Sequence, residues 1–183
     1  MKRADTRARC RAASAAIAVA MLLAQPAVAG AQDADSLREA QDRAAIAELM
    51  WNYVRAIDSL DADAYPRVFT PDGAFLAGPS ATRGPEALRK MVLDLRKGQE
   101  ERRAKGETVA AMHHVMTNEH VEFIDRDTAR IHYYWMTVFA GSPGSQPPRV
   151  AAAGRGVDEL VRVDGKWLIR TRNVTPEDRA PRP

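Results

Sequence analysis

The first candidates for catalytic residues are four histidines that lie close together in the sequence, His113, His114, His120 and His132. A neutral imidazole accepts a proton near pH 7, and a nearby carboxylate would orient it and support its charged form. His113 and His114 are adjacent in a predicted strand, so they point to opposite faces and only one should point inward. The pattern predicts proton transfer by one histidine, with His120 and His132 at the surface or at an edge.

The same cluster raises a metal hypothesis, because histidine is a common zinc ligand. The spacing does not favour it, since no His-x-His or His-x3-His pair occurs. The only cysteine, Cys10, cannot build a cysteine-based zinc site. We therefore expect no metal.

A carboxylate and a phenol are the next candidates. Asp58 falls at the end of a predicted helix, where the negative end of the helix dipole disfavours a carboxylate. It is either a solvated helix end or a group held in place for chemistry. Tyr53 lies five residues earlier and could approach the same cavity mouth, or it could be a core aromatic residue.

Two helical segments would position these side chains. Apolar residues recur at helical spacing and predict a helix over residues 36–59, with Ser36 and Glu39 as a capping box at its start. Asp63 can cap a short second helix that ends at Val68. Residues 71–73 (Pro-Asp-Gly) predict a turn.

The rest of the chain is predicted to form one short strand, one helix and then a run of strands. A short strand is predicted at 74–76, and a helix begins near Pro85 and becomes highly charged from residue 96. Four further strands are predicted, at 115–124, 129–139, 157–163 and 167–174, with a Gly- and Pro-rich loop over 141–148. Helices followed by antiparallel strands predict an α+β domain, with helices covering one face of a curved sheet.

The N-terminus reads as a secretory signal peptide over residues 1–31. Five basic residues precede a short apolar run, which ends in Ala27-Val28-Ala29 and the triplet Ala29-Gly30-Ala31. We expect cleavage after Ala29 or Ala31 and a periplasmic or secreted product; an uncleaved anchor is the alternative. The apolar run is too short to span a bilayer comfortably, and no membrane association is expected after cleavage.

Removal of this segment changes what the composition means. The whole chain has 183 residues, 27 basic and 24 acidic, for a net charge of +3. Cleavage removes five basic residues and one acidic residue, which leaves 22 basic and 23 acidic residues and a net charge of −1. Cys10 is removed too, which suits an oxidising compartment. Nucleic-acid binding loses its support.

Several motifs, in order, resemble those of SnoaL-like domains. They are Tyr53-x4-Asp58, Asp63-Ala64-Tyr65, Val68 to Ala74, His114-Val115-Met116-Thr117-Asn118, Gly154 to Leu160, and Asp164-Gly165-Lys166-Trp167-Leu168-Ile169-x2-Arg172. The resemblance covers residues 36–176 and leaves 177–183 as a flexible tail. It implies the nuclear-transport-factor-2-like cone, a strongly bent antiparallel sheet wrapped around helices that encloses one deep pocket. Scytalone dehydratase, bile-acid dehydratase, ketosteroid isomerase and polyketide cyclases share that fold, as do proteins that only bind ligands.

The resemblance also implies site residues. An Asp at the position of Asp58 pairs with a His in dehydratases of this fold, and the family pattern selects His114 rather than His113. Tyr53 and Arg172 would hold the oxygen that gains or loses charge. By strand alternation Arg170 shares the face of Arg172, with a surface salt bridge as the competing interpretation of both.

A second set of residues would bind the substrate. Tyr133 and Trp135 share one face of their strand and could line the pocket, although Trp135 could equally pack on the helices. Met116 and Arg155 complete the set, with Arg155 at the rim. Gly156 replaces a usual aromatic residue, which would widen the entrance.

The hypothesis that follows is a cofactor-independent lyase, dehydratase or isomerase acting on a hydrophobic, hydroxylated small molecule. The alternative is a non-catalytic small-molecule-binding module, which a blocked pocket or a separated Asp58 and His114 would favour. By resemblance, we expect a homodimer formed through the open face of the sheet.

Overall fold

A computed structural model of the chain describes residues 25–141 and 147–176. The chain divides into two compact units, Met1–Ala44 and Ala45–Pro183. The predicted signal peptide and tail lie largely outside the described residues, so both stay predictions. Among the residues that are described, no helix is long and apolar enough to cross a bilayer.

The first helix, α2, spans Gln25–Asp58, and its residues 25–44 belong to the first unit. It ends where the sequence predicts, but it already runs through Ser36 and Glu39, so the capping-box prediction is wrong. The upstream residues explain the difference, because alanine recurs at 27, 29, 31 and 34 and favours helix more than any other residue.

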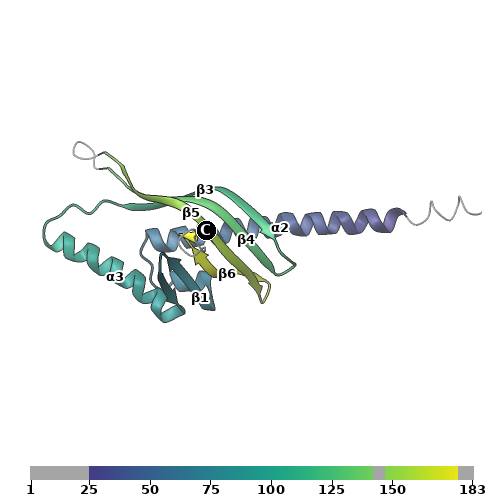
Figure 1. The fold of residues 1–183 in the computed structure, drawn as a ribbon, viewed down its shortest axis with the longest axis horizontal. Helices are drawn as coiled ribbons and strands as arrows, with labels where there is room; N and C mark the ends of the chain where they lie inside the picture. Colours follow the sequence, from purple (N-terminus) through teal and green to yellow (C-terminus); the bar gives the residue numbers. More distant parts are fainter. Residues whose placement is uncertain (1–24, 142–146, 177–183) are drawn as a thin grey trace, which may run out of the picture. The chain divides into compact units, whose positions relative to one another are not determined.

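The remaining elements all lie in the second unit, Ala45–Pro183 (Figure 1). They are the 3-10 helix η1 (Tyr65–Val68), strands β1 (Phe69–Ala77) and β2 (Ser80–Arg83), helix α3 (Pro85–Ala104), and strands β3 (Met112–Phe123), β4 (Thr128–Phe139), β5 (Arg149–Val163) and β6 (Lys166–Asn173). The strands form one sheet in the order β2-β1-β6-β5-β4-β3. The α+β prediction is confirmed.

The sheet differs from the predicted run of antiparallel strands in one respect. Strand β1 precedes α3 and pairs in parallel with β6, so the sheet is mixed. The Pro71-Asp72-Gly73 segment is not a turn between elements but an irregular stretch inside β1, where the register shifts between Phe69 and Ala74. The turn residues therefore bend a strand instead of ending one.

The short helix η1 has no side-chain cap among the described residues, so the prediction that Asp63 caps it is wrong, and the hydrogen bonds of this region lie in the turn before the helix. Asp61, not Asp63, accepts hydrogen bonds from the backbone N–H groups of Asp63 and Ala64, at 3.0 and 2.9 Å. These bonds lower the pKa of the Asp61 carboxyl. Asp63 instead forms an exposed ion pair with Arg89 in α3.

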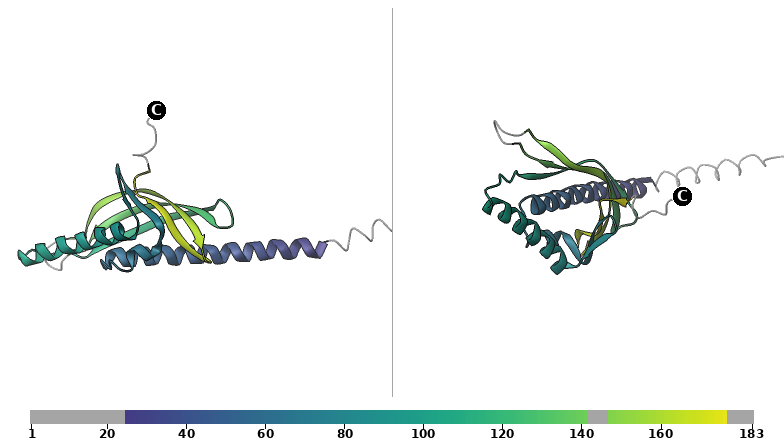
Figure 2. Two further views of the ribbon diagram at one scale, coloured as in Figure 1. Left: turned by 90° about the horizontal axis from the view of Figure 1, so that it is seen from below. Right: turned by 60° about the vertical axis from the view of Figure 1, so that its left-hand side comes forward.

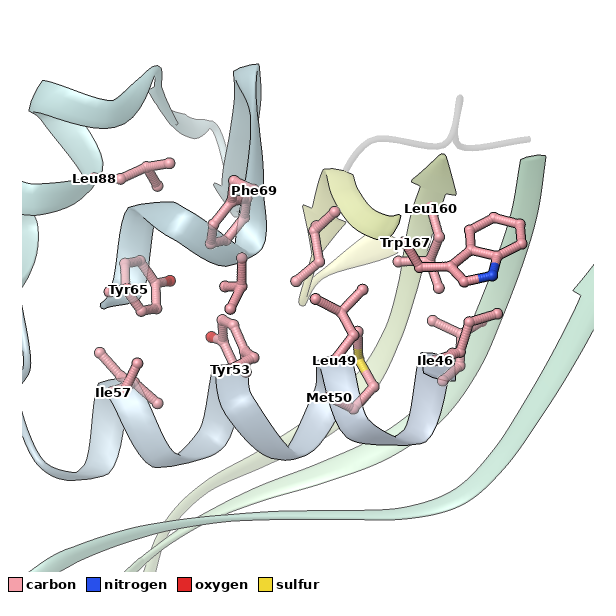
Figure 3. Packing of buried hydrophobic residues seen from close by; sticks show 14 of the residues in the cluster. Ile46, Leu49, Met50, Tyr53, Ile57, Tyr65, Phe69, Leu88, Leu160 and Trp167 are labelled. Atoms are coloured by element: carbon pink, nitrogen blue, oxygen red, sulfur yellow. The ribbon is translucent and has the colours of Figure 1, made fainter. Parts of the chain in front are cut away.

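The core lies between the curved sheet and residues 45–58 of α2. Figure 2 shows how strongly the strands bend, and Figure 3 shows the buried side chains that the helix directs toward the strands and η1. These helix residues recur every three to four positions: Ile46, Leu49, Met50, Tyr53 and Ile57. They pack with residues such as Tyr65, Phe69, Leu88, Leu160 and Trp167.

Two β-bulges decide which side chains face this core. On β3, Asn118 and Glu119 stand opposite the single residue Tyr133, because the register shifts between Thr117 and His120. Asn118 has φ of 54°, a left-handed conformation that asparagine tolerates better than most residues. Before this bulge the residues of β3 that pack against the core have even numbers, Met112 and Met116. After it they have odd numbers, Val121 and Phe123.

The second bulge lies on β6 and corrects a prediction. Ile169 pairs with Leu160 and Thr171 with Glu159, which leaves Arg170 as an extra residue. Ile169 and Arg172 are both buried, whereas Arg170 is exposed. Arg170 therefore does not share the face of Arg172, because the bulge interrupts the alternation on which that prediction rests.

Gly156 does not widen an entrance, as the sequence suggested, because the ring of Tyr133 occupies the space that a side chain there would need. A Cβ atom at Gly156 would overlap the end of that ring. The Tyr133 side chain is 3% exposed, and its hydroxyl donates a 2.8 Å hydrogen bond to Asp158. The absence of a side chain at Gly156 thus allows the Tyr133 ring to pack across β5.

We predict that Gly156→Ala lowers the free energy of unfolding by about 1–3 kcal/mol, because the buried Tyr133 ring must move and strain its hydrogen bond. The matched control is Gly98→Ala in α3, where a Cβ meets no atom within 4 Å. There the helix propensity of alanine should raise stability by up to about 1 kcal/mol. Urea denaturation measures both, and a Gly156→Ala variant as stable as the parent would contradict the account.

Candidate functional site

The structure brings Asp58 and His114 together. Asp58 is the last residue of α2, and His114 lies near the start of β3. The backbone N–H of His114 donates to both carboxylate oxygens, at 3.0 Å to Oδ1 and 3.2 Å to Oδ2. The ring Nδ1 lies 2.7 Å from Oδ1. The unfavourable position of Asp58 at a helix C-terminus is thus offset by hydrogen bonds from the strand.

This contact determines the tautomer of the His114 imidazole. An ionised carboxylate only accepts hydrogen bonds, so Nδ1 must be the donor, and a neutral ring then carries a free electron pair on Nε2. The neighbouring His113 has Nδ1 4.0 Å from Asp58 Oδ2 and a side chain that is 56% exposed, against 23% for His114. Of this adjacent pair, His114 therefore has the geometry of a base.

The other two histidines lie apart from Asp58. The rings of His120 and His132 are 6.4 Å apart, and His132 Nε2 lies 3.8 Å from Glu122 Oε2. The acidic neighbour of His132 is thus Glu122, an exposed residue, and not Asp58. Within the described residues, no group of three His, Cys, Asp or Glu side chains gathers as a metal site would require.

A pocket of about 360 Å³ opens between α2 and β3 beside the histidine. Its walls are mostly apolar, and its polar side chains are those of His114 and Glu119. The lining residues are Ala47, Met50, Trp51, Val54, His114, Val115, Met116 and Glu119. Trp51 is 59% exposed, so an aromatic surface is open to solvent at this site. The His114 imidazole thus faces a space suited to a small, largely apolar molecule.

The predicted oxygen-binding residues form a separate, buried cluster. The Arg172 guanidinium pairs with Asp158, Nη1 to Oδ2 at 2.5 Å, and both side chains are almost fully buried. Its Cζ lies 3.8 Å from the centre of the Tyr53 ring and 4.7 Å from that of Tyr133. Such distances place the cation over two aromatic faces.

Two methionines separate this cluster from the pocket. The Met116 and Met50 sulfurs accept from Arg172 at 3.3 Å (Nη2) and 3.9 Å (Nη1). The Nε of Arg172 is buried and has no hydrogen-bond partner among the described residues. Met116 and Met50 also line the pocket, so they form the wall between a buried cation and the space beside His114.

Burial controls the electrostatics of the cluster. It raises the pKa of the Asp158 carboxyl to about 6, although Arg172, Tyr133 and the Asn173 backbone N–H all favour the charged form. Burial alone would lower the pKa of Arg172, but Asp158 and the tyrosines raise it above its ordinary value. Burial and Asp158 likewise raise the pKa of Tyr133. At neutral pH Asp158 and Arg172 form a carboxylate–guanidinium pair, and Tyr133 is a neutral phenol.

The other predicted substrate-binding residues lie away from the dyad. Trp135 Nε1 donates to the backbone oxygens of Val174 and Arg155, at 3.0 and 3.2 Å. Arg155 is exposed, and both residues line a different concavity of about 630 Å³ that includes Tyr134. Of the predicted substrate-binding set, only Met116 lines the pocket beside His114.

Sequence reasoning missed two acidic residues. Asp158 follows Gly154 and Gly156 at the inward positions of β5, and a buried carboxylate there needed a cationic partner. Glu119 lies in the bulge on β3 and lines the pocket beside His114 with an exposed side chain. Alternation could have revealed Asp158, whereas nothing in the local pattern signalled the position of Glu119.

Comparison with known proteins assigns the fold to a family. The family model of the SnoaL-like domain matches residues 38–173. This chain belongs to the SnoaL-like domain family. A comparison with curated proteins gives no significant match.

Solved structures share the SnoaL-like fold. A nuclear-transport-factor-2-like protein with a cystatin-like fold from Novosphingobium aromaticivorans is 22% identical, with a TM-score of 0.61 over 76% of this chain and 84% of that one. A protein of the same organism, provisionally named a scytalone dehydratase, is 18% identical, with a TM-score of 0.59 over 75% and 85%. Another, provisionally named an aromatic ring hydroxylase, is 26% identical, with a TM-score of 0.57 over 73% and 87%. The predicted resemblance is confirmed.

We predict that Asp158→Asn destabilises the SnoaL-like domain by about 3–5 kcal/mol, because it leaves the buried Arg172 charge without a counter-charge. Asp63→Asn removes one partner of an exposed ion pair and should cost less than about 1 kcal/mol. Urea denaturation at pH 7 compares the two. Adding Arg172→Met to Asp158→Asn should recover part of the loss, and equal effects of the two single changes would contradict this account.

Proposed function

We propose that this protein is a proton-transfer enzyme, a lyase or dehydratase or an isomerase, that acts on a hydrophobic, hydroxylated small molecule. The observation that carries the proposal is the contact between Asp58 and His114 at the edge of an apolar pocket. A member of the SnoaL-like fold provisionally named a scytalone dehydratase supports a role of this kind.

The dyad supplies the base. Asp58 holds the His114 ring by its Nδ1 and holds the backbone N–H of the same residue, so the side chain and its strand are fixed together. The free pair on Nε2 accepts a proton from a carbon acid, and the carboxylate stabilises the imidazolium that forms. An apolar ligand bound against the apolar walls would displace water from the imidazole and strengthen this interaction.

The alternative, a module that only binds small molecules, is favoured by one observation. Tyr53 and Arg172 are 3% and 2% exposed, and neither lines the pocket beside His114. Arg172 is also neutralised by Asp158. In this conformation neither residue reaches a ligand in that pocket, so the proposed chemistry uses the dyad without them.

We also propose that the domain works outside the cytoplasm, after loss of residues 1–31, and as a homodimer. The charge and apolar pattern of the N-terminus supports the first point. Resemblance to SnoaL-like proteins supports the second.

The proposal predicts that the protein catalyses base-promoted ring opening of nitrobenzisoxazole, a planar carbon acid small enough for the pocket. His114 would remove the ring C–H proton while the N–O bond breaks and a coloured cyanonitrophenolate forms. His114→Ala should lower the rate constant by about 100-fold, in the range that general base catalysis contributes. Absorbance of the nitrophenolate measures the rate.

His113→Ala is the matched control, because this more exposed neighbour does not line the pocket and should be dispensable. The rate constant of Asp58→Asn should lie between those of His114→Ala and His113→Ala, since the His114 ring keeps its place in β3 but loses its counter-charge. A His114→Ala variant as fast as the parent would refute the assignment and leave the binding module as the better interpretation.

A further inference from the structure

We infer that Glu119 is a second catalytic group of the same pocket, the acid that protonates a departing hydroxyl while His114 removes a proton from carbon. This inference rests on the proposed function and adds to it the reaction type, elimination of water from a β-hydroxy carbonyl compound. Glu119 and His114 come from one strand and line one pocket.

The bulge on β3 is what places Glu119 there. Before it, Met112 and Met116 pack against the core, with His114 between them; after it, Val121 and Phe123 do so. The inward set therefore changes from even to odd numbers at Asn118, and Glu119 falls on the odd-numbered face, where its exposed side chain lies at the edge of the pocket. In an unbroken strand the five-residue interval between His114 and Glu119 would put the two side chains on opposite faces.

The spacing suits a small ligand. At about 3.3 Å per residue, with one residue taken up by the bulge, the two backbone positions lie roughly 13 Å apart. Met116 lies between them on the same strand and lines the pocket. The two side chains can therefore approach a small ligand from its two ends.

The Glu119 carboxylate is available for this role. It makes no hydrogen bond and no ion pair with any residue in the described part of the chain. Partial burial raises its pKa, and the more distant Arg172 opposes that rise. An apolar ligand in the pocket covers the carboxyl further and raises its pKa again, which favours the protonated form that an acid needs.

The reaction balances without a further reagent. Nε2 of His114 takes the proton from the carbon next to the carbonyl group, and that electron pair forms the C=C bond. The C–O bond to the hydroxyl breaks as Glu119 gives its proton to the oxygen, so water leaves. The proton on His114 then returns to Glu119 through solvent, which restores both groups.

The test compares two probes that differ in the leaving group. The first is the β-hydroxyketone that forms from benzaldehyde and acetone, whose dehydration gives benzalacetone and needs a protonated leaving group. The second is nitrobenzisoxazole, whose phenolate leaves without a proton. Glu119→Gln should lower the dehydration rate constant by about 100-fold and that of the ring opening far less. Glu119→Asp should restore part of the dehydration.

Glu122→Gln is the matched control, because this exposed carboxylate on the same strand interacts with Arg130 and His132 instead of the pocket. It should leave both rates unchanged. Glu119→Gln dehydrating as fast as the parent overturns the inference, and so does an equal loss on both probes, which would mean that Glu119 only shapes the pocket. If instead His114→Ala keeps the ring-opening rate, the proposed function itself fails.

Discussion

The buried ion pair between Asp158 and Arg172 is the constraint on which the rest of the sheet domain depends. A guanidinium in a core is tolerated only when a carboxylate and further favourable contacts compensate its desolvation. Here the carboxylate comes from β5, a phenol hydroxyl from β4, and aromatic faces from α2 and β4. The pair therefore joins these elements around one charge.

Several local features make sense as requirements of this pair. The bulge at Arg170 brings Arg172 to the inward face, and the missing side chain at Gly156 lets Tyr133 reach Asp158. Met50 and Met116 close the remaining side of the cation with polarisable sulfur. Because the charge is neutralised and covered in this way, the pocket beyond the methionines holds a separate set of polar groups, which Arg172 influences only through its charge. Its polar side chains are the His114 imidazole, held by Asp58, and the Glu119 carboxylate, which pairs with no residue in the described part of the chain.

Much of this arrangement could be predicted from the sequence. The sequence pattern located the second half of α2, strands β3, β4 and β6, and parts of β1 and β5, but not β2, and strand alternation separated His113 from His114. The motif order identified the SnoaL-like family and paired Asp58 with His114. These predictions rest on patterns that each segment carries within itself.

The errors share a different origin. The inward position of Arg172 and the place of Glu119 at the pocket come from bulges, and a bulge is a property of two paired strands, so neither strand reveals it alone. The space at Gly156 is filled from β4, 23 residues earlier in the chain. The predicted cap of η1 is absent because Asp61, not Asp63, accepts the backbone hydrogen bonds, and those bonds belong to the turn before the helix.

The central claim is that Asp58 fixes the His114 ring with its proton on Nδ1 and a free electron pair on Nε2. Nitrogen NMR of the neutral imidazole tests this most directly, because the protonated and unprotonated ring nitrogens have well separated shifts. The account predicts an Nδ1–H tautomer for His114 in the parent protein and a shift toward the Nε2–H tautomer in Asp58→Ala. A proton on Nε2 of His114 in the parent, or a tautomer that does not respond to Asp58→Ala, would contradict it.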